Sequence, residues 1–255
     1  MPDQPDIAIE FLHVDYAVNG SRPLLSDFSL NIHRNEVLVL LGRSGSGKTT
    51  TLKLINRLLT PTRGEVRVEG RSTVAWDAIQ LRRKIGYAVQ EVGLFPHYTV
   101  EENVALIPSV EGWEKQRIQR RVKEVLSLVA LPYETFADRY PHQLSGGQRQ
   151  RVGLARALAA DPPMLLMDEP FGALDPLTRA ELQREFMALR KRLGTTVVFV
   201  THDVGEALLL GNRIALLEAG KTMGVFTPPE LLASNDERIR AYLETYRMSL
   251  QPRDR

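Results

Sequence analysis

Three glycines and a lysine within eight residues place the strongest constraint on how this chain can fold. The segment reads Gly42-Arg43-Ser44-Gly45-Ser46-Gly47-Lys48-Thr49. It follows the short apolar run 36–41, which predicts a buried strand, and it opens the stretch 47–59, whose apolar residues recur at helical spacing. A strand, a glycine-rich loop and a helix in this order are the context that a P-loop requires. The alternative, a flexible glycine turn, leaves the flanking elements unexplained.

The residue types in this loop suit the binding of ATP phosphates. Glycines let the backbone turn so that successive N–H groups point inward, and the N-terminus of the following helix adds its dipole. Lys48 is expected to reach the β- and γ-phosphate oxygens, and the Thr49 hydroxyl to ligate Mg²⁺. The predicted nucleotide-binding residues of this segment are Gly42, Arg43, Ser44, Gly45, Ser46, Gly47, Lys48, Thr49 and Thr50.

A second candidate site lies where the apolar strand predicted at 164–167 ends in the adjacent carboxylates Asp168 and Glu169. Neighbouring strand residues face opposite ways, so the two acids can do different work. Asp168 is expected to hold Mg²⁺ through its water shell, and Glu169 to orient or deprotonate the water that attacks the γ-phosphate. An acidic pair at a strand end is usually only surface; the P-loop upstream is what favours the catalytic interpretation.

Helical and strand-like patterns alternate along the rest of the chain. Residues 7–14 and 28–32 alternate as strands, residues 90–143 read mostly as helix, and a clear amphipathic stretch spans 115–129. A helix, a strand, a helix and a strand then follow, which predicts an α/β fold with a mostly parallel sheet and helices on both faces. These four elements are expected at 147–159, 164–167, 177–193 and 195–200.

No linker marks a second domain, so we expect a single domain over residues 1–255. Within it, a helical subdomain is expected at about 90–160. A short extension of two strands and a helix is expected at about 212–255, with no regulatory domain after it.

Composition excludes several classes of protein. The absence of cysteine rules out disulfides and thiolate metal sites, and suits a reducing cytoplasm. A net charge of only +2 lacks the concentrated basic field of a nucleic-acid binder. The acidic N-terminus precedes no apolar region, and no window reaches the roughly 18 apolar residues that span a bilayer. We therefore expect neither a secreted nor an integral membrane protein.

A third motif, Leu144-Ser145-Gly146-Gly147-Gln148, precedes Asp168 by 24 positions counted from Leu144. Here the sequence resembles the ABC ATPase family, and the resemblance covers essentially the whole chain. It implies a P-loop NTPase core with an N-terminal antiparallel β subdomain and a helical signature subdomain. It also implies that Ser145, Gly147 and Gln148 grip the γ-phosphate of ATP bound to a second subunit, so that the ATPase works as a dimer, expected to be a homodimer.

The same resemblance suggests roles for four further residues, each with an ordinary alternative. Gln90 looks like the glutamine that senses Mg²⁺ and the attacking water, although a surface polar residue is the alternative. His202 resembles the histidine that contacts the γ-phosphate, although a strand-end cap is the alternative. Asp175 matches a loop that communicates across the dimer, and its alternative is an ordinary helix start. Tyr16 looks like the aromatic residue that stacks on adenine, where simple packing is the alternative.

Three classes of P-loop protein compete for this sequence. The motif at residues 144–148, which is the signature of the ABC ATPase family, excludes a small-molecule kinase. DNA-repair ATPases of the family carry long coiled-coil insertions and its translation factors fuse two cassettes, whereas here Lys48 and Asp168 are 120 positions apart in one cassette. We therefore expect a transporter ATPase, peripheral on the cytoplasmic face of the cell membrane. Its partners would be an integral membrane permease and, indirectly, a solute-binding protein, with no nucleic acid.

The expected direction is import. Segments 90–97 and 99–104 look like the importer version of the stretch that contacts the membrane subunit. Residues 93–97 and the pair Ile107-Pro108 resemble importers of quaternary amines such as glycine betaine, choline or carnitine. Many relatives in that group carry a C-terminal pair of regulatory domains, which we expect this chain to lack. Import of amino acids or another small solute, and a non-transport ABC ATPase, remain alternatives.

Overall fold

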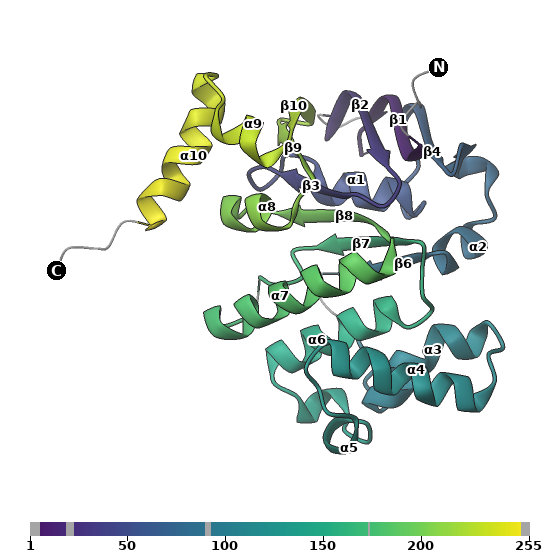
Figure 1. Cartoon of the computed structure of the whole chain (residues 1–255). Helices are drawn as coiled ribbons and strands as arrows, with labels where there is room; N and C mark the ends of the chain where they lie inside the picture. The colour runs from purple at the N-terminus through teal and green to yellow at the C-terminus, as the bar shows by residue number, and fades with distance from the viewer. Residues whose placement is uncertain (1–5, 19–22, 90–92, 173, 251–255) are drawn as a thin grey trace. The chain divides into compact units, whose positions relative to one another are not determined.

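The computed structural model describes residues 6–18, 23–89, 93–172 and 174–250, and of 189–193 and 245–250 the backbone alone (Figure 1). Two compact units emerge: unit 1 comprises residues 1–76 and 198–255, and unit 2 comprises residues 77–197. In the described part of the chain, none of the helices combines the length and the apolar character that crossing a bilayer demands.

The first sheet of unit 1 is antiparallel and lies near the N-terminus (Figure 1). Its strands alternate buried and more exposed residues, as expected of a sheet with one face on the core. Phe11 and Phe28 meet edge to face across two of them, with ring centroids 5.2 Å apart. The N-terminal antiparallel β subdomain is thereby confirmed. In spatial order its strands are β2 (Leu25–His33), β1 (Ile7–Tyr16), β4 (Arg63–Val68) and β5 (Arg71–Ser72).

A second set of strands in unit 1 forms the central layer. Every residue of β3 (Val37–Leu41) and β8 (Thr196–Thr201) is buried, which explains why both read as continuous apolar runs rather than as alternating ones. β3 pairs in parallel with β9 (Arg213–Glu218), which forms a hairpin with β10 (Lys221–Phe226). The strand order is β10-β9-β3-β8.

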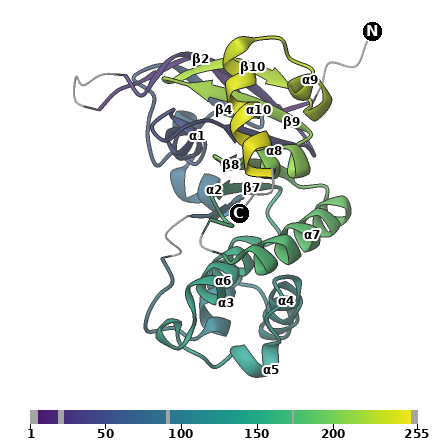
Figure 2. The same ribbon diagram turned by 90° about the vertical axis from the view of Figure 1, so that its left-hand side faces the viewer.

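In the described residues of unit 1, four helices and one short 3-10 turn accompany the strands. Helix α8 packs along β3, and α10 packs against α8 (Figure 2). The bounds are α1 (Lys48–Ile55), the 3-10 turn η1 (Thr73–Ala75), α8 (Val204–Leu210), α9 (Pro228–Leu232) and α10 (Glu237–Leu250).

Helix α1 is shorter than the expected stretch 47–59. It ends at Ile55 because Arg57 adopts a left-handed φ of 54°. The backbone N–H groups of Leu58 and Leu59 then both donate to the carbonyl of Lys53, at 2.8 and 3.0 Å. These bonds satisfy a carbonyl that the shortened helix leaves without its usual partner.

The described part of unit 2 contains a parallel strand pair together with several helices. Strand β6 (Ile85–Ala88) pairs in register with β7 (Met164–Asp168), Ile85 opposite Met164 and Ala88 opposite Met167. Gly86 permits the close approach of helix α6 (Gly146–Leu158), since a Cβ there would lie 2.3 Å from the carbonyl oxygen of Ala157. The strand expected at 164–167 is therefore observed with one more residue, the carboxylate Asp168.

The helices of unit 2 include the mostly helical insertion predicted between residues 90 and 143. Helices α3, α4 and α6 pack against one another (Figure 1). Pro108 lies inside α3, where it has no N–H to donate to the preceding turn, so the helix has one hydrogen bond fewer near its C-terminal end. The bounds are α2 (Ala78–Arg83), α3 (Val100–Val110), α4 (Lys115–Leu128), α5 (Tyr133–Phe136), the 3-10 turn η2 (Pro141–Gln143), α6 (Gly146–Leu158) and α7 (Pro176–Leu193).

Candidate functional site

The glycine-rich loop connects β3 to α1, as the sequence predicts. Gly45 and Gly47 have φ angles of 77° and 101°, a region that L-residues with a side chain rarely enter. A Cβ on Gly42 would lie 2.4 Å from the carbonyl oxygen of Leu217, and one on Gly47 would lie 2.6 Å from Cδ2 of Leu25. Gly42 and Gly47 thus have no room for a side chain on this path, and glycine at 45 avoids the backbone strain of a positive φ.

Lys48 lies at the centre of this loop. Its Nζ donates to the carbonyl oxygens of Gly42, at 2.7 Å, and Arg43, at 2.9 Å, and only 6% of the residue is exposed. The loop thus closes around a lysine ammonium. Thr51, which the sequence analysis did not select, is fully buried and donates its hydroxyl to the carbonyl of Gly47 at 3.0 Å, fixing the first turn of α1 to the loop.

The start of α1 suits an anion. Gly47 is the N-cap residue and offers no capping side chain, and the first turn contains no acidic residue. The amide groups of that turn lack intrahelical acceptors and carry the positive end of the helix dipole. Thr49 is exposed and Thr50 half-buried on the same turn. Loop, ammonium and helix end together fit a phosphate group.

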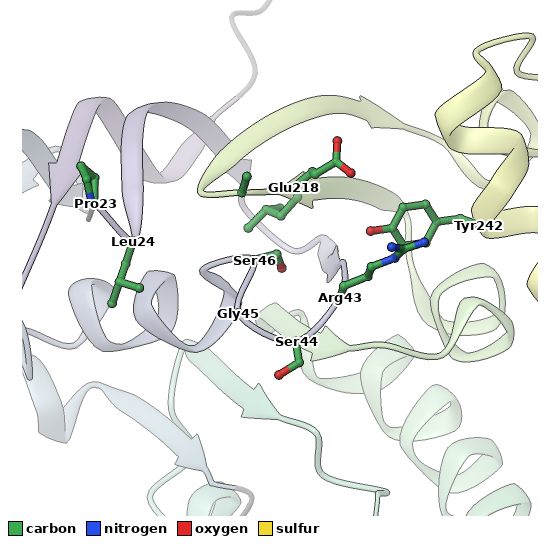
Figure 3. Close-up of a pocket in the computed structure, with 10 residues that line it drawn as sticks. Pro23, Leu24, Arg43, Ser44, Gly45, Ser46, Glu218 and Tyr242 are labelled. Carbon is green, nitrogen blue, oxygen red and sulfur yellow. The ribbon is translucent and has the colours of Figure 1, made fainter. Parts of the chain in front are cut away.

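A cavity of about 360 Å³ opens beside this loop (Figure 3). Tyr242 of α10 borders it, and the Arg43 guanidinium lies 5.8 Å from the centroid of the Tyr242 ring, within reach of a cation–π contact. Helical periodicity alone could not have singled out Tyr242. The lining residues are Pro23, Leu24, Arg43, Ser44, Gly45, Ser46, Leu217, Glu218, Ala219 and Tyr242.

Two further predicted site residues belong to unit 1. Tyr16 is the last residue of β1 and half-buried, and its carbonyl accepts a hydrogen bond from the N–H of Leu24 at 2.8 Å. It does not line the cavity beside the loop. His202 is exposed in the turn between β8 and α8, directly before Asp203, whose side chain caps α8.

The two predicted carboxylates lie in unit 2. Asp168 ends β7 and is 5% exposed, whereas Glu169 is half-buried in the following turn with a φ of 46°. That left-handed conformation is costly for a residue with a side chain and re-aims Glu169 away from the strand direction. The Glu169 carbonyl accepts from the N–H of Gly172 at 3.1 Å and from Nε2 of Gln150 at 3.4 Å. The acids thus differ in both burial and backbone conformation.

The pKa of Tyr87 on β6 depends on burial and on the charge of Asp168. Burial, and to a smaller extent the negative charge of Asp168, raises the pKa of Tyr87 to about 12. Both effects favour the neutral phenol, so Tyr87 stays protonated throughout the physiological range.

The signature residues open α6. Ser145 is its N-cap: the hydroxyl accepts from the N–H of Gln148 at 3.2 Å, and the Gln148 side chain accepts from the N–H of Ser145 at 2.9 Å. Gly147 approaches Leu174 so closely that a Cβ would lie 3.1 Å from it. In this capping box the side chains of Ser145 and Gln148 already satisfy two amides of the helix end.

Asp175 is the N-cap residue of α7. Its side chain accepts from the N–H of Thr178 at 3.0 Å, and that hydrogen bond lowers the pKa of Asp175. The ordinary interpretation of Asp-Pro as a helix start is what the structure shows locally. Gln90 lies outside the described residues.

A groove of about 330 Å³ in unit 2 contains part of the segments expected to contact a membrane subunit. Phe95 and Ile107 line it together with Arg156, whose Nη1 donates to the Gly93 carbonyl at 2.9 Å. Burial lowers the pKa of Arg156, although an arginine stays charged at any physiological pH. The groove therefore combines apolar walls with one largely desolvated cation.

Among the residues that the structure describes, no group of three or more His, Cys, Asp or Glu side chains could hold a metal ion. A hydroxyl on Thr49 and a carboxylate on Asp168 are the kinds of ligand that Mg²⁺ accepts alongside phosphate oxygens and water.

A family profile and curated relatives match most of this chain. The profile of the ABC transporter family matches residues 25–172. The carnitine transport ATP-binding protein OpuCA of Listeria monocytogenes is 48% identical over 88% of this chain and 56% of its own length. The choline transport ATP-binding protein OpuBA of Bacillus subtilis is 46% identical over 92% of this chain and 62% of its own length. The chain thus spans about three fifths of the length of these curated relatives.

A solved structure agrees with the sequence relatives. The dimeric post-hydrolysis state of the ATP-binding cassette MJ0796, bound to ADP and Pi, superposes with a TM-score of 0.79 at 36% identity, over 86% of this chain and 98% of that one. A P-loop between a buried strand and a helix, with a signature at a second helix start, defines a nucleotide-binding cassette of the P-loop NTPase class. The chain belongs to the ABC transporter family. The fold class and the family expected from the motifs are confirmed.

Proposed function

We propose that this chain is the ATP-binding and ATP-hydrolysing subunit of an importer for a quaternary-amine osmoprotectant such as glycine betaine, choline or carnitine. The observation that carries the catalytic part is the glycine-rich loop closed around Lys48 at the start of α1. The solute class rests on the identity of 46–48% to relatives named for carnitine and choline transport. We further propose that both units act as one ATPase cassette.

ATP binding would use the loop 42–47 and the first turn of α1. The amides of this segment and the Lys48 ammonium would hold the phosphates, with Thr50 on the same turn. Tyr16 would stack on adenine. Its position at the end of β1, half-buried rather than packed in the core, supports that role without requiring it.

Mg²⁺ would be held by Thr49, Gln90 and Asp168 together with phosphate oxygens. When bound, the ion neutralises charge on the β- and γ-phosphates. Asp168 suits such a site because a carboxylate oxygen is the kind of ligand that Mg²⁺ accepts beside phosphate oxygens.

Hydrolysis would proceed by in-line attack of water on the γ-phosphorus. Glu169 would take the proton from this water as the new P–O bond forms and the bond to the β–γ bridging oxygen breaks, yielding ADP and inorganic phosphate. Lys48 and His202 would stabilise the charge on the γ-phosphoryl group, and Gln90 would help to position the water. The left-handed backbone of Glu169 supports a functional placement of its carboxylate.

Two chains would be needed for a complete site. Ser145, Gly147 and Gln148 would contact the γ-phosphate held by the P-loop of a second copy, and the related cassette described above is dimeric. To contact the phosphate, the side chains of Ser145 and Gln148 would either share their capping-box hydrogen bonds at the start of α6 with it or break them.

An integral membrane permease is the proposed partner, with the solute-binding protein contacting the permease rather than this chain. The groove around Phe95, Ile107 and Arg156 supports a docking site for a short apolar element that also carries an acceptor for the arginine. With such a partner, the subunit would lie on the cytoplasmic face of the membrane as a peripheral protein.

Two measurements test the proposal at separate levels. The purified chain should hydrolyse Mg-ATP, Lys48→Ala should lower its ATP affinity at least 10-fold, and Glu169→Gln should retain binding, lose turnover and dimerise with ATP. Cells whose other osmoprotectant carriers are deleted should lose uptake of labelled glycine betaine, choline and carnitine when their only copy carries Glu169→Gln. If Lys48→Ala bound ATP as tightly as the wild type, the proposed nucleotide site would be wrong. If the purified chain hydrolysed ATP but cells carrying Glu169→Gln kept their uptake of these solutes, the proposed solute class would be wrong.

A further inference from the structure

The turn that carries His202 is closed by three hydrogen bonds. The Thr201 hydroxyl donates to Oε2 of Glu206 at 2.6 Å and accepts from the N–H of Asp203 at 3.0 Å. Oδ1 of Asp203 accepts in turn from the N–H of Glu206 at 3.1 Å. One hydroxyl can donate and accept at once, so all three bonds can exist together. They form a closed cycle whose members flank His202 on both sides in the sequence.

The cycle is buried although the histidine is not. Thr201 and Glu206 are 2% and 7% exposed, while His202 is exposed. A hydrogen bond from a hydroxyl to a carboxylate is short and strong, and burial removes competing water. Helix α8, which contains Glu206, packs along β3, so the cycle is attached to the central sheet. The turn is therefore held rigidly beneath an exposed imidazole.

We propose that Thr201 and Glu206 are positioning residues for His202, holding its imidazole where it contacts the γ-phosphate of ATP. This inference rests on the role given to His202 in the proposed function. Neither residue would touch the nucleotide. Both act by restricting the backbone on each side of His202.

Positioning should affect turnover more than binding. A misplacement of about 1 Å in a group that acts on the reacting centre can cost on the order of 100-fold in rate. ATP binding draws mainly on the P-loop and on the adenine contact, which the cycle leaves untouched. Loss of the cycle should therefore lower kcat with little change in KM for ATP.

Thr201→Val and Thr201→Ser form a matched pair for the test. Valine keeps the shape but removes the hydroxyl, and we expect kcat of the purified chain to fall about 10-fold, with KM within about 2-fold of the wild-type value. Serine retains the hydroxyl and should keep kcat within about 2-fold. Glu206→Gln, which retains an acceptor oxygen, should fall between the two. Rates are scaled to the fraction of sites that bind a fluorescent ATP analogue, so that loss of folded protein does not count as loss of kcat.

The decisive comparison repeats Thr201→Val in a His202→Ala background. If the hydroxyl acts through the imidazole, the second substitution should lower the residual kcat by less than about 2-fold. If Thr201→Val lowered kcat by a further factor of about 10 in that background, the positioning role would be wrong while the proposed function would stand. If His202→Ala by itself left hydrolysis unchanged, the proposed catalytic role of His202 would fall, and this inference with it.

Discussion

Asn103 and Phe95 are joined by two reciprocal hydrogen bonds: Oδ1 of Asn103 accepts from the Phe95 N–H at 2.8 Å, and its Nδ2 donates to the Phe95 carbonyl at 3.1 Å. The same Nδ2 lies 3.1 and 2.9 Å from the carbonyls of Tyr98 and Thr99. Asn103 is fully buried. One side chain thus holds the segment that places Phe95 in the groove of unit 2.

Removing this side chain should destabilise the protein. Asn103→Ala removes the side-chain partner of the part-buried Phe95 N–H and Tyr98 carbonyl, each bond worth about 0.5–1.5 kcal/mol, so we expect a loss of about 1–3 kcal/mol in the free energy of unfolding. Asn103→Asp keeps the acceptor but faces three carbonyls with a carboxylate, and should lose at least as much. Denaturant unfolding measures both. Gln116→Ala, at an exposed position of α4 in the same unit, should change the free energy by less than about 0.5 kcal/mol.

Gly47→Ala should abolish the phosphate-binding shape of the loop. The added methyl would meet Leu25 Cδ2 at 2.6 Å and the Leu24 carbonyl at 3.0 Å, at a φ of 101°. We expect ATP affinity to fall at least about 10-fold, by calorimetry or a fluorescent analogue. Gly70→Ala is the control, since its φ of 70° imposes similar backbone strain while a Cβ there meets nothing within 4 Å. Equal loss of affinity in both variants would mean that general destabilisation by a strained backbone, not the close contact in the loop, explains the effect.

Tyr242→Phe should be neutral or slightly stabilising. The Tyr242 hydroxyl is buried and has no hydrogen-bond partner among the residues that the structure describes, so deleting it removes an unmet polar group while the ring stays beside Arg43. Tyr242→Leu also removes the cation–π contact and should cost about 0.5–1 kcal/mol at low salt. Urea unfolding distinguishes the two; a clear loss with phenylalanine would show that the hydroxyl is bonded in solution.

The ionisation of Tyr87 should be delayed to about pH 12. Its raised pKa means that the folded state favours the neutral phenol. The unfolded chain therefore ionises first above pH 10, and the contribution to stability is lost as pH rises from about 10 to 12. Ultraviolet titration against Tyr87→Phe isolates this one group. Asp168→Asn should lower the Tyr87 pKa only slightly, because burial is the larger cause.

Much of the fold could be predicted from local pattern. The segments expected at 147–159, 177–193 and 195–200 appear at 146–158, 176–193 and 196–201. Their apolar periodicity, the Asp-Pro start and the serine cap are properties of neighbouring residues, which the sequence displays directly. The early end of α1 at Ile55 was missed because a positive φ at Arg57 carries no such signature.

Contacts between distant residues were not predictable in this way. Tyr242 and Arg43 are 199 positions apart, and nothing in helical spacing says which side of α10 meets the P-loop. Asn103 looked like part of an importer-like segment, and its hydrogen bonds to the loop at Phe95 became visible only once the loop had a defined path. The cycle of Thr201, Asp203 and Glu206 escaped notice for the same reason, although its members are close in sequence.

The sequence by itself determined the family, the P-loop, the paired carboxylates and the order of strands and helices, because glycine conformations, capping and apolar periodicity act over a few residues. Only the tertiary structure decided which side chains support these motifs: the closing of the loop around Lys48, the left-handed turn at Glu169 and the buried cycle beneath His202. Hydrogen-bond geometry and burial depend on how the chain is packed in three dimensions, and that information is not present in any local stretch of residues.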